Sequence, residues 1–260
     1  MAWSGIVRTA IEGAAIAMKP RIVRAIAQLG YLDAGLYALG RLLADASGGR
    51  WALYKYRFVA QRVSGAALSG GRGRGIEVRL CRHPDQLPRP YPRRPEVLAA
   101  RHQQGARSLA ACKDGRLVGF LWLLGDGYLE DEVRVRYRLL SPQSAWDFDV
   151  WVRPEERLGP TFARLWDEAN RLLRAQSVRW SCSRISAFNP GSLGAHARIG
   201  TVAIGSAVFL RCGRWQWMLA SLTPFIHLSR GPASLPELRF DTSGLPHPPS
   251  MEPPCATSNK

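Results

Sequence analysis

The sequence predicts an α/β fold in which a mixed central sheet is flanked by helices and preceded by a helical extension. Three observations predict it. Apolar residues at helical spacing fill residues 1–47 and return over Pro160–Gln176. Segments that alternate apolar and polar residues, as strands do, occur at several places from residue 51 onward. Lys113-Asp114-Gly115 separates two apolar runs, and Asp-Gly in this position is a strong signal for a hairpin.

Residues 1–75 are predicted to lie outside the main domain. Residues 1–47 form a helical extension whose basic residues leave two interpretations open: a helix on an anionic membrane surface, or helices packed on the main domain, which we favour. Trp51–Val59 alternates apolar with basic residues, as a half-exposed strand does. Ser64–Gly75 is rich in Gly and Arg and predicts a flexible linker, so residues 48–75 form a strand and a linker.

Residues 76–229 are predicted to form the main domain, and residues 230–260, where Pro and polar residues dominate, a disordered tail. The predicted elements of the domain, in chain order, are a strand at Ile76–Leu80, a helix at Glu96–Gln104, a hairpin of Ser108–Lys113 and Leu117–Leu124, strands at Val133–Leu140 and Trp146–Val152, a helix at Pro160–Gln176, and strands at Val178–Phe188 and Val202–Leu210 on either side of a short helix.

The chain is strongly basic. Its formal net charge is +16, from 36 Lys and Arg against 20 Asp and Glu. Almost all of the basic residues are Arg, which suits bidentate contact with phosphate and carboxylate, although a GC-rich genome would give the same bias. A basic surface favours an acidic partner, whether a nucleotide cofactor, an anionic lipid or a nucleic acid.

The cysteines indicate the compartment and argue against a metal site. The five cysteines are scattered, without a CxxC pair and without a His at metal-ligand spacing. This disfavours both a disulfide framework and a zinc site, and it predicts a reducing compartment. We expect a cytoplasmic protein without bound metal, and peripheral contact at the inner face of the membrane stays open as an alternative.

A short segment after the strand at Val178–Phe188 is the best indication of an enzyme. Asn189 is placed to cap a helix and Gly200 to end it. His196 follows on a neighbouring turn of the same helix. A His in this position can hand a proton to a leaving group. The alternative is that His196 is packed in the structure or exposed to solvent and has no catalytic role.

The segments together resemble the GCN5-related N-acetyltransferase (GNAT) superfamily over roughly residues 76–213. Lys113–Phe120 resembles the family's early strand pair, and Val152–Arg157 its strand-to-loop passage ahead of the cofactor-binding helix. Asn189–Ser192 followed by His196 is similar to its closing segment. The resemblance implies a GNAT-like sheet and transfer of an acyl group from a coenzyme A thioester to an amine.

One departure from the family's pattern concerns the donor. The family's loop ahead of the helix is rich in glycine, so that backbone N–H groups cradle the pyrophosphate of coenzyme A. Here the resemblance leaves Arg157, Gly159 and Thr161 as contacts, while Pro160 supplies no donor and Phe162 replaces a small residue. The expected donor is therefore acetyl-CoA, another acyl-CoA or, because the protein is basic, an acidic acyl carrier protein.

Acyl transfer from a thioester to an amine needs a base for the amine, hydrogen-bond donors for the oxyanion, and a proton for the departing thiolate. We predict that His196, oriented by Ser192, protonates the thiolate. Asn189 is expected to hold the pantetheine arm, to cap the helix, or both. Main-chain N–H groups near Val150 and Val152 are expected to meet the oxyanion.

The base is predicted among the carboxylates of the strand at Trp146–Val152 and the residues after it. Asp147 and Asp149 alternate and so share one face, beside apolar side chains that would raise their pKa values. Asp149 is the first choice and Glu156 the second. For each acid the alternative is a solvated or Arg-paired charge. The acidic run Glu130–Glu132 is expected either to bind the acceptor or, more simply, to form a salt-bridged strand face.

Two other functions stay open. One is a catalytically inactive GNAT-like scaffold, which the altered loop favours. The other is a basic nucleic-acid-binding protein, because three short basic or aromatic–basic segments are able to follow a phosphate backbone: Tyr54–Phe58, Gly71–Gly75 and Arg89–Arg94. For the enzyme, a small-molecule or a lipid-linked amine remains open as the acceptor.

Overall fold

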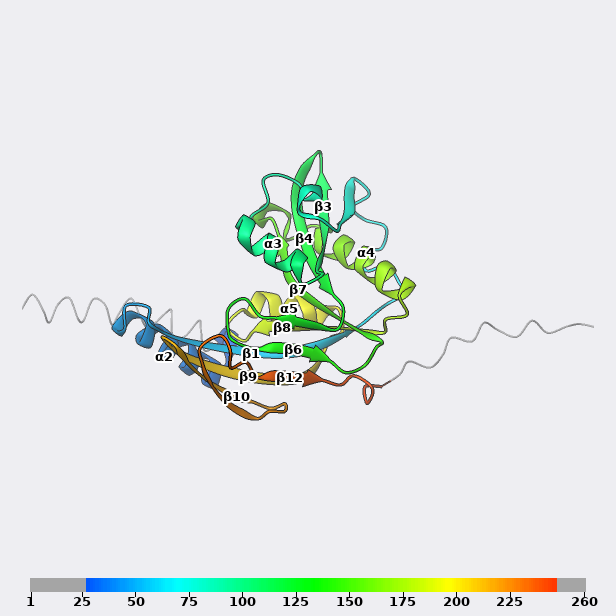
Figure 1. Cartoon of the computed structure of the whole chain (residues 1–260). Helices are drawn as coiled ribbons and strands as arrows, with labels where there is room; N and C mark the ends of the chain where they lie inside the picture. The colour runs from blue at the N-terminus through cyan, green and yellow to red at the C-terminus, as the bar shows by residue number, and fades with distance from the viewer. Residues whose placement is uncertain (1–26, 247–260) are drawn as a thin grey trace, which may run out of the picture.

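The computed structural model describes residues 27–246, and residues 1–26 and 247–260 lie outside the described part (Figure 1). Its central sheet has nine strands: β1 (Trp51–Arg62), β2 (Ile76–Cys81), β3 (Arg107–Lys113), β4 (Arg116–Leu124), β7 (Ser144–Val152), β8 (Trp180–Ser186), β9 (Val202–Cys212), β10 (Trp215–Ala220) and β11 (Ile226–Arg230). They lie in the order β11-β10-β9-β1-β8-β7-β4-β3-β2. Every neighbouring pair is antiparallel except β7 and β8, which are parallel.

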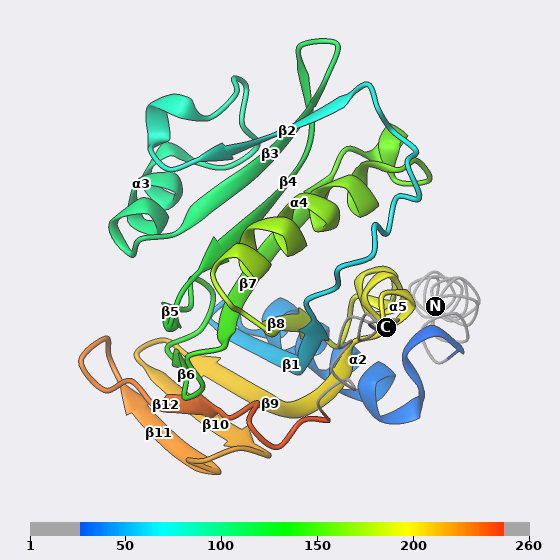
Figure 2. The same ribbon diagram turned by 90° about the vertical axis from the view of Figure 1, so that its right-hand side faces the viewer.

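Helices cover both faces of this sheet. On one face lies α4 (Thr161–Ala175), whose Leu165 and Trp166 are buried against Leu109 and Leu121 of β3 and β4 (Figure 2). The opposite face of the same strands is covered by α3 (Pro95–Gln103). From Leu117 to Leu124 the strand β4 has no polar side chain, because both of its faces are buried there. The predicted mixed sheet with flanking helices is confirmed, and α2 (Tyr31–Ala46) belongs to the predicted helical extension. Within residues 27–246, no helix has the length and apolar character needed to cross a membrane.

The strand β1 lies inside the sheet, so the predicted domain boundary at residue 76 is wrong. Phe58 of β1 pairs with β8 on one side and with β9 on the other. Its neighbours Lys55 and Arg57 both form ion pairs with the buried Asp33 of α2, at 2.6 and 2.8 Å. The basic residues of β1 therefore lie on a partly exposed face, as predicted, and there they are paired with an acidic side chain of α2.

The predicted flexible linker is packed along α4. The main-chain N–H groups of Leu68 and Ser69 donate to the Asp167 carboxylate, at 2.6 and 3.3 Å. Farther along the segment, Gly73 lies against the start of the helix, where an added Cβ atom would stand 2.8 Å from Cγ of Pro160. The segment therefore connects β1 to β2 as a strap across α4, and its glycines serve close approach as well as turning.

Gly73→Ala is expected to destabilise the protein more than Gly70→Ala. Both residues have a positive φ, 74° and 57°, which strains any residue with a Cβ atom. Only Gly73 would also collide with a neighbour, because nothing lies within 4 Å of a Cβ at Gly70. We expect an additional loss of about 1–3 kcal/mol for the Gly73 variant, measured by thermal unfolding of both. Equal melting temperatures would contradict the packed strap.

The C-terminal part is also folded, contrary to the predicted tail at residues 230–260. A second sheet contains β5 (Gly127–Leu129), β6 (Arg136–Leu139) and β12 (Glu237–Phe240), and β12 pairs in parallel with β6. Phe240 is buried, and the hydroxyl groups of Thr242 and Ser144 lie 2.6 Å apart. The predicted strand at Val133–Leu140 therefore belongs to this small sheet. The predicted disorder of residues 247–260 and the predicted helix of residues 1–26 lie outside the described residues.

Candidate active site

The site begins where the two parallel strands of the sheet separate. The strands β7 and β8 pair from Ser144 opposite Trp180 as far as Asp147 opposite Ser183. Beyond that point β7 continues to its end beside β4 alone. Diverging strand ends leave a crevice at the carboxyl edge, which is the common place for a ligand in sheets with parallel strands. A cavity of about 400 Å³ lies there.

A bulge in β7 shapes one wall of this cavity. Trp122 of β4 pairs with Phe148, but Phe120 pairs with Trp151, so two residues of β7 stand opposite one residue of β4. These two residues are Asp149, which has a φ of 48°, and Val150. Both line the cavity. Val150, near which a main-chain N–H is predicted to meet the oxyanion, thus lies where the regular strand register is interrupted.

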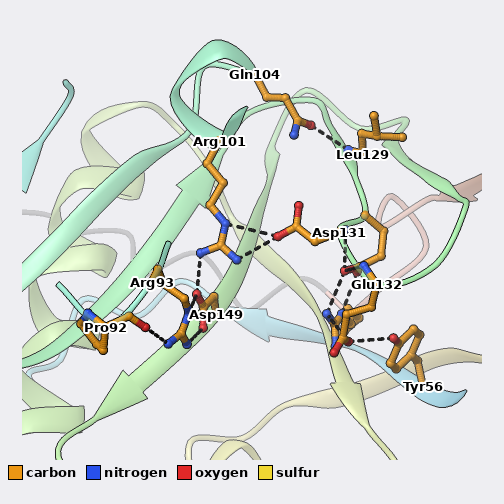
Figure 3. Close-up of polar contacts among 11 residues, drawn as sticks. Tyr56, Pro92, Arg93, Arg101, Gln104, Leu129, Asp131, Glu132 and Asp149 are labelled. Atoms are coloured by element: carbon orange, nitrogen blue, oxygen red, sulfur yellow. Dashed lines mark hydrogen bonds and ion pairs between the residues drawn. The ribbon is translucent and has the colours of Figure 1, made fainter. Parts of the chain in front are cut away.

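Asp149 is held by two arginines, as Figure 3 shows. Arg93 donates two hydrogen bonds to its carboxylate, and Arg101 bridges Asp149 and Asp131, at 2.5 and 2.9 Å. Burial by itself would raise the pKa of Asp149, but the hydrogen bonds and charges of the two arginines outweigh burial and lower the pKa. This is the opposite of the raised pKa expected for Asp149 as a base. The carboxylate is a fixed anion that joins the bulge to α3.

Asp147 has the properties expected of the base. The residue belongs to the lining of the cavity, its side chain is fully buried, and Oδ1 accepts a hydrogen bond of 2.5 Å from the Ser181 hydroxyl. Oδ2 has no hydrogen-bond partner among residues 27–246. Burial raises the pKa of Asp147 to about 7, although the hydroxyl groups of Ser181 and Ser183 oppose the shift. The two acids that sequence alternation treats alike therefore have opposite environments.

His196 forms another wall, from α5 (Pro190–Arg198). Asn189 caps this helix by accepting a hydrogen bond of 3.0 Å from the main-chain N–H of Ser192. The Nδ1 atom of His196 lies 2.9 Å from the main-chain carbonyl oxygen of Ser192. Because a carbonyl oxygen only accepts, Nδ1 carries the proton. Burial lowers the pKa of His196, so the ring is neutral near pH 7 and Nε2 presents a lone pair.

The remaining predicted site residues lie around the turn that leads into α4, away from the cavity lining. Glu156 forms an ion pair with Lys113 at 3.0 Å, and it does not line the cavity. Arg157 donates from Nε to the carbonyl oxygen of Val152 at 3.3 Å, and Gly159 donates its N–H to the carbonyl oxygen of Glu156 at 3.0 Å. Glu156 therefore lacks the position needed for the base.

The first turn of α4 has no side-chain cap. Pro160 at the N-cap makes no side-chain cap, and the first main-chain N–H that bonds within the helix is that of Arg164. Thr161 is buried and its hydroxyl has no hydrogen-bond partner in the described part of the chain. Phe162 packs edge-on against His196, with ring centroids 5.9 Å apart. This contact brings the start of α4 next to the wall of the cavity.

Two residues of the acidic run at Glu130–Glu132, Asp131 and Glu132, line the cavity. Glu130 is buried and accepts two hydrogen bonds from Arg184 of β8, at 2.7 and 2.8 Å. Glu132 pairs with the same guanidinium at 2.9 Å and accepts a hydrogen bond from the Tyr56 hydroxyl at 2.9 Å. The run is thus salt-bridged, which was one of the two expectations for it. Its partners are Arg101 of α3 and Arg184 of β8. No group of three His, Cys, Asp or Glu side chains within residues 27–246 is placed to hold a metal.

No protein-family model and no curated protein matches the chain. Three similar solved structures are a functionally unknown conserved protein from Staphylococcus epidermidis (12% identity, TM-score 0.43), a tandem GNAT protein from the clavulanic acid biosynthesis pathway (18%, 0.43) and a GCN5-related N-acetyltransferase from Sphaerobacter thermophilus (18%, 0.42). They match 66%, 65% and 65% of this chain, which spans 66%, 57% and 54% of theirs. Two of the three are named as members of the family that the sequence resembles.

Proposed function

We propose that this protein is an acyltransferase that moves an acyl group from a thioester to an amine. One observation carries the proposal: the opening between β7 and β8 places a buried carboxylate and a neutral imidazole in the lining of one cavity. Asp147 has a pKa of about 7, and His196 presents a lone pair at Nε2. Both groups are suited to take protons from an amine near neutral pH.

The proposed proton path differs from the sequence-based expectation. An amine enters as the ammonium ion and loses its first proton to Asp147, which exchanges it with solvent. As the nitrogen attacks the thioester carbon, it loses a second proton to Nε2 of His196. The same imidazole then passes this proton to the departing thiolate. His196 thus acts first as an acceptor, because its own proton is held at Nδ1 by Ser192.

The oxyanion of the attacked thioester is assigned to the bulge. A main-chain N–H near Val150–Val152 is proposed to donate to it, since a bulge leaves ladder groups of the strand without a partner. Asp149 then has a positioning role, because its two arginines fix the bulge in place. The distance between the N–H group and the oxyanion depends on how rigidly this bulge is held.

The donor is proposed to be a coenzyme A thioester. Its pyrophosphate would lie at the uncapped first turn of α4, where free N–H groups and the helix dipole favour an anion, beside the guanidinium of Arg157. These residues fit an anionic group, although Gly159 already uses its N–H within the turn. Coenzyme A would supply the activated acyl group. An acyl carrier protein remains the alternative donor, and the basic surface is the feature that favours it.

Donor binding tests the proposal directly. Calorimetry and native mass spectrometry with acetyl-CoA, longer acyl-CoAs and an acyl carrier protein are expected to show micromolar binding of at least one thioester. Arg157→Gln is expected to weaken coenzyme A binding about 3- to 10-fold, since one charge-assisted contact is lost. Arg171→Gln, an exposed arginine of α4 paired with Glu168, is the matched control and should bind normally. Absence of binding by every donor would favour the inactive scaffold or the nucleic-acid-binding protein.

A further inference from the structure

The cavity between β7 and β8 is an acidic spot in a strongly basic protein. Within residues 27–246, three basic side chains line it, namely Arg93, Arg101 and Arg184. Four carboxylates of the same range line it, namely Asp131, Glu132, Asp147 and Asp149. Glu130 lies behind them, so five carboxylates face three guanidiniums here, whereas the whole chain carries +16. A cation is therefore favoured in this place and disfavoured over the molecule as a whole.

Two of these carboxylates, Asp131 and Glu132, are more exposed than any of the three arginines. The three arginine side chains are between 7% and 29% exposed, and each is hydrogen-bonded to a carboxylate. The side chains of Asp131 and Glu132 are 32% and 49% exposed. Glu132 is held through Oε2 by Tyr56 and Arg184, and no donor within residues 27–246 contacts its Oε1. The rim of the cavity thus presents a preorganised carboxylate with one oxygen left for a ligand.

A second carboxylate belongs to the lining but is fully buried. Oδ2 of Asp147 is buried and has no partner among the described residues, although the residue lines the cavity. The lining also includes the rings of Tyr128 and Phe148, which stack at 4.3 Å, and Ile185. An acceptor with a cationic group at each end and a short apolar chain between them matches a lining that combines carboxylates with apolar side chains.

We propose that the acceptor is a primary diamine or a longer polyamine. The inference rests on the acyltransferase function proposed above. One ammonium group lies at Asp147, loses its proton there and becomes the nucleophile. The second ammonium group stays charged and is bound by Glu132 and Asp131 at the rim. The C–S bond of the thioester breaks, a C–N bond forms at the inner nitrogen, and a mono-acylated diamine, a free thiol and one proton are released.

Three amines of equal chain length test this proposal. With acetyl-CoA as donor, 1,5-diaminopentane is expected to have a kcat/KM about ten-fold or more above that of 1-aminopentane, because only the diamine meets both carboxylates. The third amine, 5-aminopentanoate, replaces the second cation with a carboxylate and is expected to be the poorest. A preference for 5-aminopentanoate would overturn the proposal, since it would mean that the arginines bind the far end of the acceptor.

The variant that tests the rim is Glu132→Gln, which keeps the shape and removes the charge. The ratio of kcat/KM for diaminopentane to that for aminopentane is expected to fall towards one. The matched control is Glu168→Gln, which removes an ion-paired carboxylate from the surface of α4 and should leave the ratio unchanged. A ratio that is unaffected by Glu132→Gln would remove Glu132 from the site.

Calorimetry of 1,5-diaminopentane without any donor separates this inference from the acyltransferase proposal. Diamine binding that weakens in Glu132→Gln supports the acidic site even if no acyl transfer is found. Acyl transfer to all three amines at similar rates would support the enzyme and contradict the diamine. Failure to transfer an acyl group to any amine, together with no binding of any donor, would remove the proposed function itself.

Discussion

Asp147→Asn is expected to lower kcat by a factor of 10²–10⁴ with the fold intact, the range usual for the loss of a positioned general base. The amide has nearly the same shape and its oxygen can still accept the hydrogen bond from Ser181, but it cannot take a proton from an ammonium ion. The largest effect should therefore appear in kcat, while the affinity for the donor changes little. Steady-state kinetics and donor calorimetry on the same preparation measure both quantities.

The pH dependence provides a second readout for Asp147. Because burial raises its pKa to about 7, the carboxylate form accumulates as pH rises through 7, and kcat/KM of the wild type should rise with it. The Asn variant should lose this rise. The stability of the fold changes with pH in the opposite direction. Because the pKa of Asp147 is higher in the folded state, its protonation stabilises the fold at pH values below the unfolded-state pKa, and this contribution is lost as pH increases towards 7. The Asn variant is then expected to match or exceed the melting temperature of the wild type at pH 8.

The control for this prediction is Asp85→Asn, which changes an exposed carboxylate in the short 3-10 helix Pro84–Gln86. It should retain both the rate and the pH profile. If Asp147→Asn kept a wild-type kcat, or kept the rise through pH 7, another group would have to be the base. Asp149 would be a poor replacement, because its paired arginines lower its pKa and it stays ionised over this range.

The elements that the sequence predicted well depend on local signals. The turn at Lys113-Asp114-Gly115 has the positive φ values that Asp-Gly favours, 50° and 73° at Asp114 and Gly115. The helix α4 follows the spacing of its buried apolar residues, and α5 begins at Asn189 because the side chain of that residue caps it. Each of these features is decided by residues close together in the chain, so no knowledge of the tertiary fold is needed.

The features that the sequence missed depend on residues far apart in the chain. The strand β1 enters the sheet between β8 and β9, and nothing within its own segment reveals these partners. The environments of Asp147 and Asp149 differ because Arg93 and Arg101 approach only one of them, from positions 56 and 48 residues earlier. A bulge also breaks the alternation on which the equal treatment of the two acids was based. Local patterns identified the strand that carries the two acids, and tertiary contacts determine which of them has a raised pKa.

His196→Ala is expected to lower kcat by about 10²–10³, and added imidazole should restore part of the activity. The side chain is buried between α5 and the rings of Phe162 and Trp166, so its removal leaves a space that a free imidazole fits. A histidine with only a packing role would affect stability and would give no rescue of the rate. Rescue should increase with pH as imidazole loses its proton, since the acceptor form is the one required.

His196 also predicts how the stability of the wild type falls at acidic pH. Burial lowers the pKa of His196 below 6.5, so folding favours the neutral ring, and its contribution to stability is lost as pH falls below that value. His196→Ala should be less sensitive to this acid loss, whereas His227→Ala, a change in β11 outside the cavity, should behave as the wild type in rate. If imidazole failed to rescue a folded His196→Ala protein that still binds its donor, the proton relay through Nε2 would be contradicted, and the thiolate would have to leave without protonation by this side chain.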